Sequence, residues 1–272
     1  YRPNVGSSIQ TLGFSFDIDG YRSNDVTIFS PHLFEKLEIV SWCYAKTPLS
    51  CVWAVLSSGQ LACLTWELSQ QVWGWTLCQT DGYFESVCSV IEDGEDRVYA
   101  IVRRTIEGIE RKFIERMASA ILGDIRYSCH LDSAVSYNLD TPATTFGLLD
   151  HLNGKTVDVL ADGGVHKGLV VVGGQITLPV AASIVTIGLP YQSYIETLPL
   201  GLAIAGTMAT KPQSISTVAI RVKDSRGLAI GPTDLPDEMY DVKDRRDEPY
   251  DTAPALFSGD HEVPVTANWT TR

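Results

Sequence analysis

The sequence predicts an all-β fold, in which propeller-like blades of antiparallel sheet are followed by small β-barrel or sandwich domains. Short runs rich in β-branched, aromatic and Cys residues recur roughly every ten residues, and turn signals containing Gly, Pro or Ser separate them. A first group of such runs is followed by a second group of similar size. Successive antiparallel sheets of equal size are typical of propeller blades.

The first predicted sheet lies between residues 39 and 80. Short polar turns join its runs, so that consecutive strands pair in antiparallel fashion. The four runs are IVSWCYAKTPL (39–49), SCVWAVLSSG (50–59), QLACLTWEL (60–68) and QQVWGWTLCQT (70–80).

Three tryptophans gather in this sheet, and they could form either a ligand-stacking platform or packed interior. Trp73 and Trp75 share one face of their strand by its period of two, and Trp66 falls on the same face as Leu64 and Ala62. A propeller blade buries both faces against its neighbours. We therefore expect all three tryptophans to be buried as wedges between blades.

The second predicted sheet contains FESVCSVIEDG (84–94), DRVYAIVRRTIEG (96–108) and IERKFIERM (109–117). Glu92-Asp93-Gly94 and Ile106-Glu107-Gly108 mark its turns. The last run also has helical spacing, which continues to residue 122, so an amphipathic helix is the competing prediction. Its context narrowly favours a third strand. The helically spaced residues are Ile109, Phe113, Ile114, Met117, Ala118, Ile121 and Leu122.

From residue 129 the runs contain fewer aromatics and more Val and Gly, which predicts a small separate β-domain. Further on, residues 215–232 form a hairpin candidate, and the charged stretch 234–251 is expected to be a solvated loop. Because the first residue is Tyr1 and not Met, we expect the chain to be part of a longer protein.

The predicted organisation has four parts. It runs from an N-terminal segment leading into the propeller (1–38), through propeller-like blades (39–128) and a small β-barrel-like domain (129–200), to a further, truncated β region with a charged loop (201–272).

The chain is acidic, with a net charge of −12 from 33 acids and 21 bases. Wrapping a nucleic acid requires clustered Lys and Arg, so this charge argues against such a protein. The negative charge is compatible with a protein past which a nucleic acid slides without being bound. No run approaches the ~20 apolar residues of a membrane span, so no membrane insertion is expected.

The six cysteines contain no C-x-x-C pair, so a zinc site is not expected. Apolar or aromatic residues flank most of them, which predicts small, buried hydrophobic side chains with reduced thiols. These residues are Cys43, Cys51, Cys63, Cys78, Cys88 and Cys129.

Catalytic motifs are missing: the sequence has no G-x-x-x-x-G-K-[ST], no H-E-x-x-H and no G-x-S-x-G. Asp150-His151 resembles part of a catalytic pair, and His130 lies near Asp132, but no serine in an elbow accompanies either pair. We therefore predict no catalytic, cofactor-binding or metal-binding residues and no enzyme activity. The remaining histidines, expected to be isolated and exposed, are His32, His166 and His261.

Four carboxylates cluster at Glu92, Asp93, Glu95 and Asp96. A glycosidase needs two carboxyl groups that face each other at roughly 5–10 Å across a sugar. Because this cluster straddles a predicted hairpin turn, we expect it to be a solvated tip.

Several segments resemble the tail nozzle family of short-tailed bacteriophages, also called tubular tail protein B. The most specific are LTWELSQQVWGW (64–75), VRRTIEGIERKFIER (102–116) and GLLDHLNGKTVDVLADG (147–163). The resemblance covers residues 10–200 and fades afterwards. It places the helical-looking segment on a strand.

The resemblance implies a structural protein of the virion tail, assembled in the bacterial cytoplasm, whose homohexamer forms a tube for genome ejection. Implied partners are a tail adaptor or connector ring, tail fibres, and phage DNA that passes without sequence-specific binding. A glycan-binding or glycan-cleaving β-propeller module remains the alternative, since function lies in sites and not in folds. A third hypothesis is an adhesion module without an enzyme site.

Overall fold

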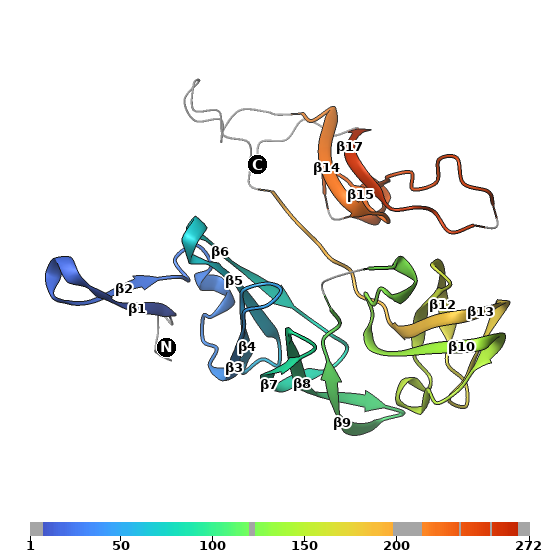
Figure 1. Ribbon diagram of the computed structural model, residues 1–272, viewed down its shortest axis with the longest axis horizontal. Coiled ribbons are helices and arrows are strands. Elements are labelled where there is room, and N and C mark those ends of the chain that lie inside the picture. The colour runs from blue at the N-terminus through green and yellow to red at the C-terminus, as the bar shows by residue number, and fades with distance from the viewer. Residues whose placement is uncertain (1–7, 120–122, 198–213, 234, 251, 266–272) are drawn as a thin grey trace. The chain divides into compact units, whose positions relative to one another are not determined.

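The computed structural model describes residues 8–119, 123–197, 214–233, 235–250 and 252–265. The chain divides into two compact units, Tyr1–Tyr191 and Gln192–Arg272. The described residues form antiparallel strands and short 3-10 turns, with no α-helix among them (Figure 1). The predicted all-β fold with several antiparallel sheets is confirmed.

The first sheet is four-stranded, in the order β3-β4-β5-β6. Each predicted run contains one of its strands, and consecutive strands pair in antiparallel register. The strands are β3 (Ile39–Ala45), β4 (Cys51–Leu56), β5 (Leu61–Glu67) and β6 (Val72–Cys78).

The second sheet is three-stranded, with β7 (Tyr83–Glu92), β8 (Glu95–Ile106) and β9 (Ile109–Arg116). Two-residue turns join these strands, and both residues of each turn have positive φ, as type I′ turns require. The strand prediction for 109–117 is confirmed over β9, while Ile121 and Leu122 lie outside the described residues.

The two sheets pack face to face. Val55 and Leu61 of the first sheet form one buried cluster with Val87, Ala100 and Val102 of the second. Among the described residues no layer covers the other face of the second sheet: most side chains of β9 are exposed, and cross-strand ion pairs lie on that face. Alternation of apolar and charged residues therefore gives this sheet one buried face.

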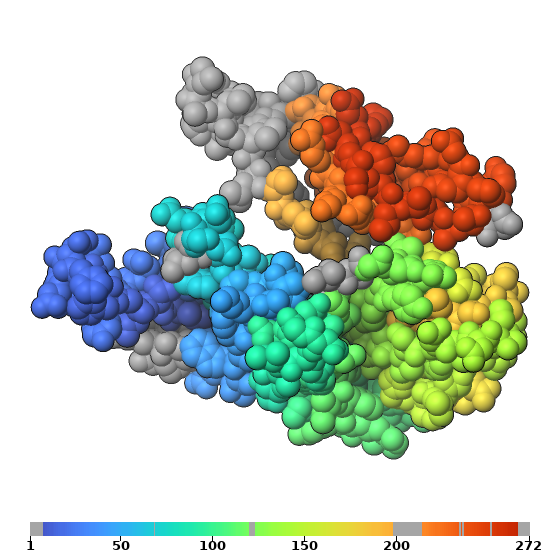
Figure 2. Space-filling model, viewed as in Figure 1, coloured from blue at the N-terminus to red at the C-terminus, as the bar shows by residue number. Residues whose placement is uncertain are grey.

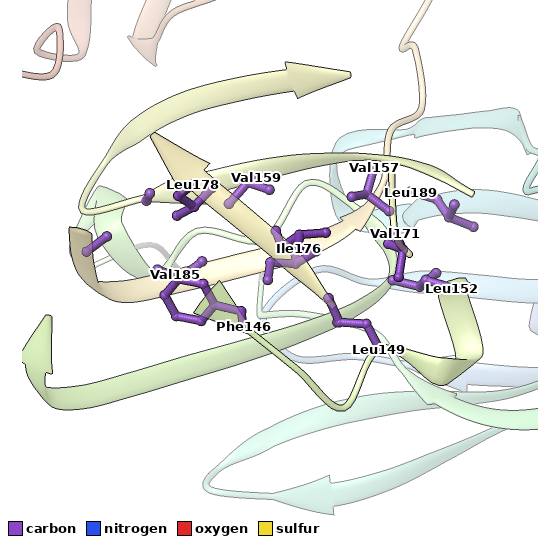
Figure 3. Packing of buried hydrophobic residues seen from close by; sticks show 13 residues of the cluster. Phe146, Leu149, Leu152, Val157, Val159, Val171, Ile176, Leu178, Val185 and Leu189 are labelled. Atoms are coloured by element: carbon purple, nitrogen blue, oxygen red, sulfur yellow. The ribbon is translucent and has the colours of Figure 1, made fainter. Parts of the chain in front are cut away.

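The third sheet has the order β10-β13-β11-β12. Its strands are β10 (Asp132–Phe146), β11 (Thr156–Ala161), β12 (Gly164–Val170) and β13 (Ile176–Leu189). Figure 3 shows its core, in which side chains from the strands meet Leu149 and Leu152 of the connecting segment. This sheet belongs to the same compact unit as the first two, so the expected boundary at 128/129 falls inside that unit.

The segment before the first sheet contains a hairpin of β1 (Gln10–Ser15) and β2 (Gly20–Asp25), which pair only with each other. It projects from the first sheet in Figures 1 and 2. The chain then returns and packs Val26 and Phe34 on one face of that sheet. This hairpin was not anticipated in the predicted leading segment 1–38.

The second unit departs from prediction. β14 (Thr217–Ser225) pairs with β17 (Phe257–Pro264), and β15 (Ala229–Ile230) pairs with β16 (Tyr240–Asp241). The predicted 215–232 hairpin is therefore wrong. The two-residue β15 offers too few partners for the apolar alternation of β14, which β17 matches by placing Val263 opposite Val218. The stretch 234–251 is not purely a solvated loop, because it contains β16.

Candidate functional site

The predicted Asp150-His151 pair lies in a 3-10 turn that packs on the second sheet. His151 Nε2 is 3.0 Å from the carbonyl oxygen of Ser133, and the His151 ring lies 6.3 Å from that of Phe113. The structural interpretation of this histidine is supported, because its contacts are with a main-chain oxygen and an apolar ring.

His130, near Asp132, is exposed. Of the three histidines expected to be exposed, His32 is exposed. His166 and His261 are half-buried, and the ring of His261 lies 4.3 Å from that of Phe257. The expectation is therefore wrong for these two, since each occupies a strand with neighbouring side chains.

The acids at the β7–β8 turn are structural groups and not a fully solvated tip. Glu92 accepts a hydrogen bond from the Tyr99 hydroxyl at 2.6 Å, and Asp96 accepts the main-chain N–H groups of Thr47 and Lys46 at 3.0 and 2.7 Å. These bonds hold the pKa of both carboxyl groups below their ordinary values. Neither acid is poised as a proton donor near neutral pH.

Beside this turn is a small open hollow between the β3–β4 connection and β8. Glu95 lies in it and is paired with Arg97 at 3.0 Å, and the Ser119 hydroxyl donates to the same carboxylate. Within the described ranges no group of three or more His, Cys, Asp or Glu side chains could hold a metal ion. Both carboxylates that line the hollow, Glu95 and Asp96, are therefore bonded within the protein.

A buried charge joins the second sheet to the loop after the first. The side chain of Arg104 is 1% exposed, and its Nε and Nη2 each donate to a Glu115 oxygen at 2.7 Å. Its Nη1 donates to Thr80 Oγ1 at 2.9 Å and to the Asp81 carbonyl at 2.7 Å. The guanidinium donates four hydrogen bonds within the protein, so it holds the structure together and is not available to a ligand.

Asp132, at the start of β10, lies near this arginine. Burial raises the pKa of the Asp132 carboxyl, and a hydrogen bond with Thr80 and the charge of Arg104 oppose that rise. Asp81 also pairs with Lys155 at 2.8 Å, so the same loop contacts the third sheet. Sequence reasoning did not single out the buried Arg104, because its partners Glu115, Thr80 and Asp81 are distant in sequence.

All six cysteines are free thiols, as predicted. Burial raises the pKa of the Cys43 thiol to about 11 and also raises those of Cys63 and Cys78. Reactive cysteines have lowered values, so these thiols are structural. Cys88 is exposed, contrary to the expectation of burial.

In the first compact unit, Tyr1–Tyr191, the exposed apolar side chains are the feature that points to a function. We call the β1–β2 hairpin the arm. Its paired residues Leu12–Ser23 and Phe14–Tyr21 make one apolar face, and the opposite face is polar. The Phe14 ring contacts those of Phe16 and Tyr21 edge-on at 5.1 and 5.7 Å. Phe16 is 90% exposed, so this ring cluster lies in solvent.

Further exposed rings lie at the two edges of the first sheet, on β3 and β6. The register places Trp42, Tyr44, Trp66 and Trp73 on one face, and we call these four residues the aromatic face. Trp42 is 59% and Trp73 41% exposed, while Trp66 is half-buried with its ring 6.3 Å from that of Trp73. The predicted burial is thus wrong for Trp73, because no layer covers this end of the sheet.

Trp75 lies on the same face but packs against the segment that returns from the arm. Its ring meets Phe34 at 4.7 Å, and its Nε1 donates to the Val26 carbonyl at 2.9 Å. It is half-buried within the cluster formed by the returning segment. The predicted burial is therefore met only in part for Trp66 and Trp75.

The chain matches none of the family models and none of the curated proteins with which it was compared. Among the described residues, no helix is long and apolar enough to cross a membrane.

Proposed function

We propose that this chain is a structural subunit of a bacteriophage tail, and that its homohexamer forms part of the tubular nozzle through which the genome is ejected. Its partners are a tail adaptor or connector ring and tail fibres, and phage DNA passes through the tube. In this proposal the stacked sheets are propeller blades, the third sheet belongs to a barrel-like domain, and the chain has no enzymatic role.

One observation carries the proposal beyond the sequence resemblance. Two apolar surfaces, the arm and the aromatic face, lie uncovered on a chain with a net charge of −12. Contiguous exposed apolar surface marks interaction sites. A subunit that assembles with copies of itself needs such surfaces.

The acidic net charge also agrees with a role in a tube through which DNA passes. Each contact between a phosphate and a Lys or Arg adds affinity, which slows passage. Around the second sheet, Arg103, Arg104 and Lys112 are paired with carboxylates, so these cations are neutralised within the protein. Such a surface repels DNA over about a Debye length of ~8–10 Å.

A glycan-binding module is the second candidate, because exposed tryptophan rings can stack on sugars. The observation in its favour is the aromatic face itself. Sugar sites combine such rings with converging polar groups that fix orientation. The strand residues on this face carry no charged side chain, and Tyr44 directs its hydroxyl to Ser50 at 3.0 Å. This composition favours a protein partner.

The proposal is tested in purified virions of the phage that encodes the chain. Mass spectrometry should detect the chain as a stoichiometric component, and antibodies raised against it should label the tail tip. The purified chain should not retard DNA at low salt. Absence from virions would remove the structural role, and a hit on a glycan array that Trp42→Ala abolishes would favour the alternative.

A further inference from the structure

The first compact unit contains two bodies, each with a hydrophobic core of its own. We call strands β3–β9 the paired sheets, whose shared core lies between the first and second sheets. The core of the third sheet is built only from residues 135–189 (Figure 3). Within the described part of the chain, no buried apolar cluster combines side chains from both bodies. Separation of the two bodies would therefore leave both cores intact.

Side chains near the surface join the two bodies. Lys155, just before β11, pairs with Asp81 at 2.8 Å, and the Asn153 amide donates to Glu107 at 2.6 Å. The Asp81 side chain is 58% exposed, and ion pairs in such positions contribute little to stability. The described strands of the two bodies share no main-chain hydrogen bond. We use the name joint for the contacts Asp81–Lys155, Glu107–Asn153 and Phe113–His151.

Asp132 lies beside the joint, and its carboxyl group is largely enclosed. Its hydrogen bond with Thr80 connects the third sheet to the loop after the first sheet. Burial raises the pKa of this carboxyl group because the charged form loses water. Opening of the joint would return that water, so ionised Asp132 favours the open form and protonated Asp132 the closed form. The titratable and charged groups that act on it or respond to it are Cys78, Arg104, Glu115, Cys129 and Tyr191.

An interface of this kind permits motion. Parts of one chain move relative to each other by default unless the interface between them is large and hydrophobic. The contacts of the joint are mainly polar, and each body keeps its own core. We propose that the third sheet moves as an intact body relative to the paired sheets, and that the joint opens before either core unfolds. This inference does not depend on a role in a phage tail.

Single-molecule energy transfer tests the motion. Two dyes are attached to p-acetylphenylalanine at positions 91 and 165, because Ile91 and Val165 are exposed and lie one on each body. Raising NaCl to about 1 M shortens the Debye length to ~3 Å and screens the Asp81–Lys155 pair. We expect the transfer efficiency to shift with salt. An efficiency that does not change would overturn the proposal.

A second dye pair controls for effects of salt on the dyes. Positions 91 and 109 are both exposed and both belong to the second sheet. Their transfer efficiency should stay constant at every salt concentration. An equal shift for this pair would show that the change seen between the two bodies does not come from the joint, and it would overturn the proposal.

Two lysine variants locate the motion. Lys155→Met removes an ion pair of the joint and should raise the ratio of open to closed molecules about 2- to 5-fold. Lys112→Met is the matched control, since it removes a pair with Glu85 at 2.7 Å that lies within the second sheet. The control should behave like wild type. Equal shifts in both variants, or none in Lys155→Met, would contradict the joint. Circular dichroism melts check that both variants are folded.

Asp132→Asn tests the enclosed carboxyl group. The variant should lower the open fraction at pH 7, because its side chain carries no charge to hydrate. At acidic pH the wild-type carboxyl is protonated, so the two chains should agree. An open fraction at pH 7 that is unchanged or larger in the variant would contradict the part assigned to Asp132.

Urea separates opening of the joint from unfolding. The efficiency of the 91/165 dye pair should change at a lower urea concentration than the tryptophan fluorescence of the unlabelled chain. That fluorescence reports the paired sheets, because five of the six tryptophans lie there: Trp42, Trp53, Trp66, Trp73 and Trp75. Coincident transitions would show that the two bodies unfold as one and would overturn the proposal.

Discussion

The third sheet and the amino-terminal part of the chain use the same alternation of apolar residues with opposite results. In the third sheet, strands β10, β11 and β13 enclose a core in which Phe146 is 2% exposed (Figure 3). In the arm, Phe16 is 90% exposed. Alternation thus shows that a face is apolar, whereas the presence of a second layer decides whether that face becomes core or contact surface.

The largest expected effect compares these two phenylalanines directly. Phe146→Ala should lower the free energy of unfolding by about 3–5 kcal/mol, since it leaves a cavity in the core. Phe16→Ala should change it by no more than about 0.5 kcal/mol, because that ring is 90% exposed and meets only the edge of Phe14. Urea unfolding at a concentration where the chain is monomeric measures both. Similar losses in the two variants would show that the arm is packed in solution.

The next comparison uses two neighbouring arginines. Arg104→Ala should cost about 3–5 kcal/mol, because it leaves the Glu115 carboxylate without its buried partner. Arg103→Ala should cost about 0–1 kcal/mol, although Arg103 contacts both Glu85 and Glu110, because these pairs are partly exposed. Thermal and urea unfolding of the two variants give the difference. Equal costs would place Arg104 in a solvated site.

The two tryptophans of β6 sharpen the comparison within one strand. Trp75→Ala should cost about 2–4 kcal/mol, since it loses Phe34 and the hydrogen bond to Val26. Trp73→Ala should cost about 1 kcal/mol, because much of its ring already contacts water. A larger loss for Trp73 than for Trp75, measured by urea unfolding, would indicate that a layer covers the aromatic face of the single chain.

The smallest expected effect is a dependence on pH. Burial raises the pKa of Asp132, so ionisation of this carboxyl opposes folding. Its stabilising contribution is complete below the pKa of the unfolded chain and is lost as pH rises through the folded value. Asp132→Asn should therefore melt at a higher temperature than wild type at pH 7, and the difference should vanish at acidic pH.

Asp96 provides the opposite sign and serves as the control. Main-chain hydrogen bonds from Thr47 and Lys46 lower its pKa, so its contribution is present at neutral pH and is lost as pH falls through the folded value. Asp96→Asn should melt lower than wild type at pH 7. Melting temperatures that shift in the same direction in both variants at pH 7 would contradict the opposite pKa shifts of the two carboxyl groups.

Local features of this fold were predictable from the sequence. The runs of β3 to β9 follow from strand composition, and Asp93-Gly94 and Glu107-Gly108 take the positive φ values of tight hairpin turns. The residues of β9 fit both the helical and the strand period, and their pairing with β8 makes them a strand.

Features that depend on distant segments were not predictable. The exposure of Trp73 depends on where residues 26–37 lie, and the pairing of β14 depends on residues 257–264. The buried Arg104 depends on Glu115 and on the loop at Thr80. The surfaces now proposed as contacts follow from which faces remain uncovered, which only the assembled sheets reveal.

The measurement that tests the central claim most directly is an electron cryomicroscopy reconstruction of the phage tail with this unit fitted into the density. We predict six copies around the tail axis, with the exposed rings of the arm, such as Phe16, buried between neighbouring copies. A reconstruction without the chain, or one in which the arm and the aromatic face both remain in solvent, would contradict it.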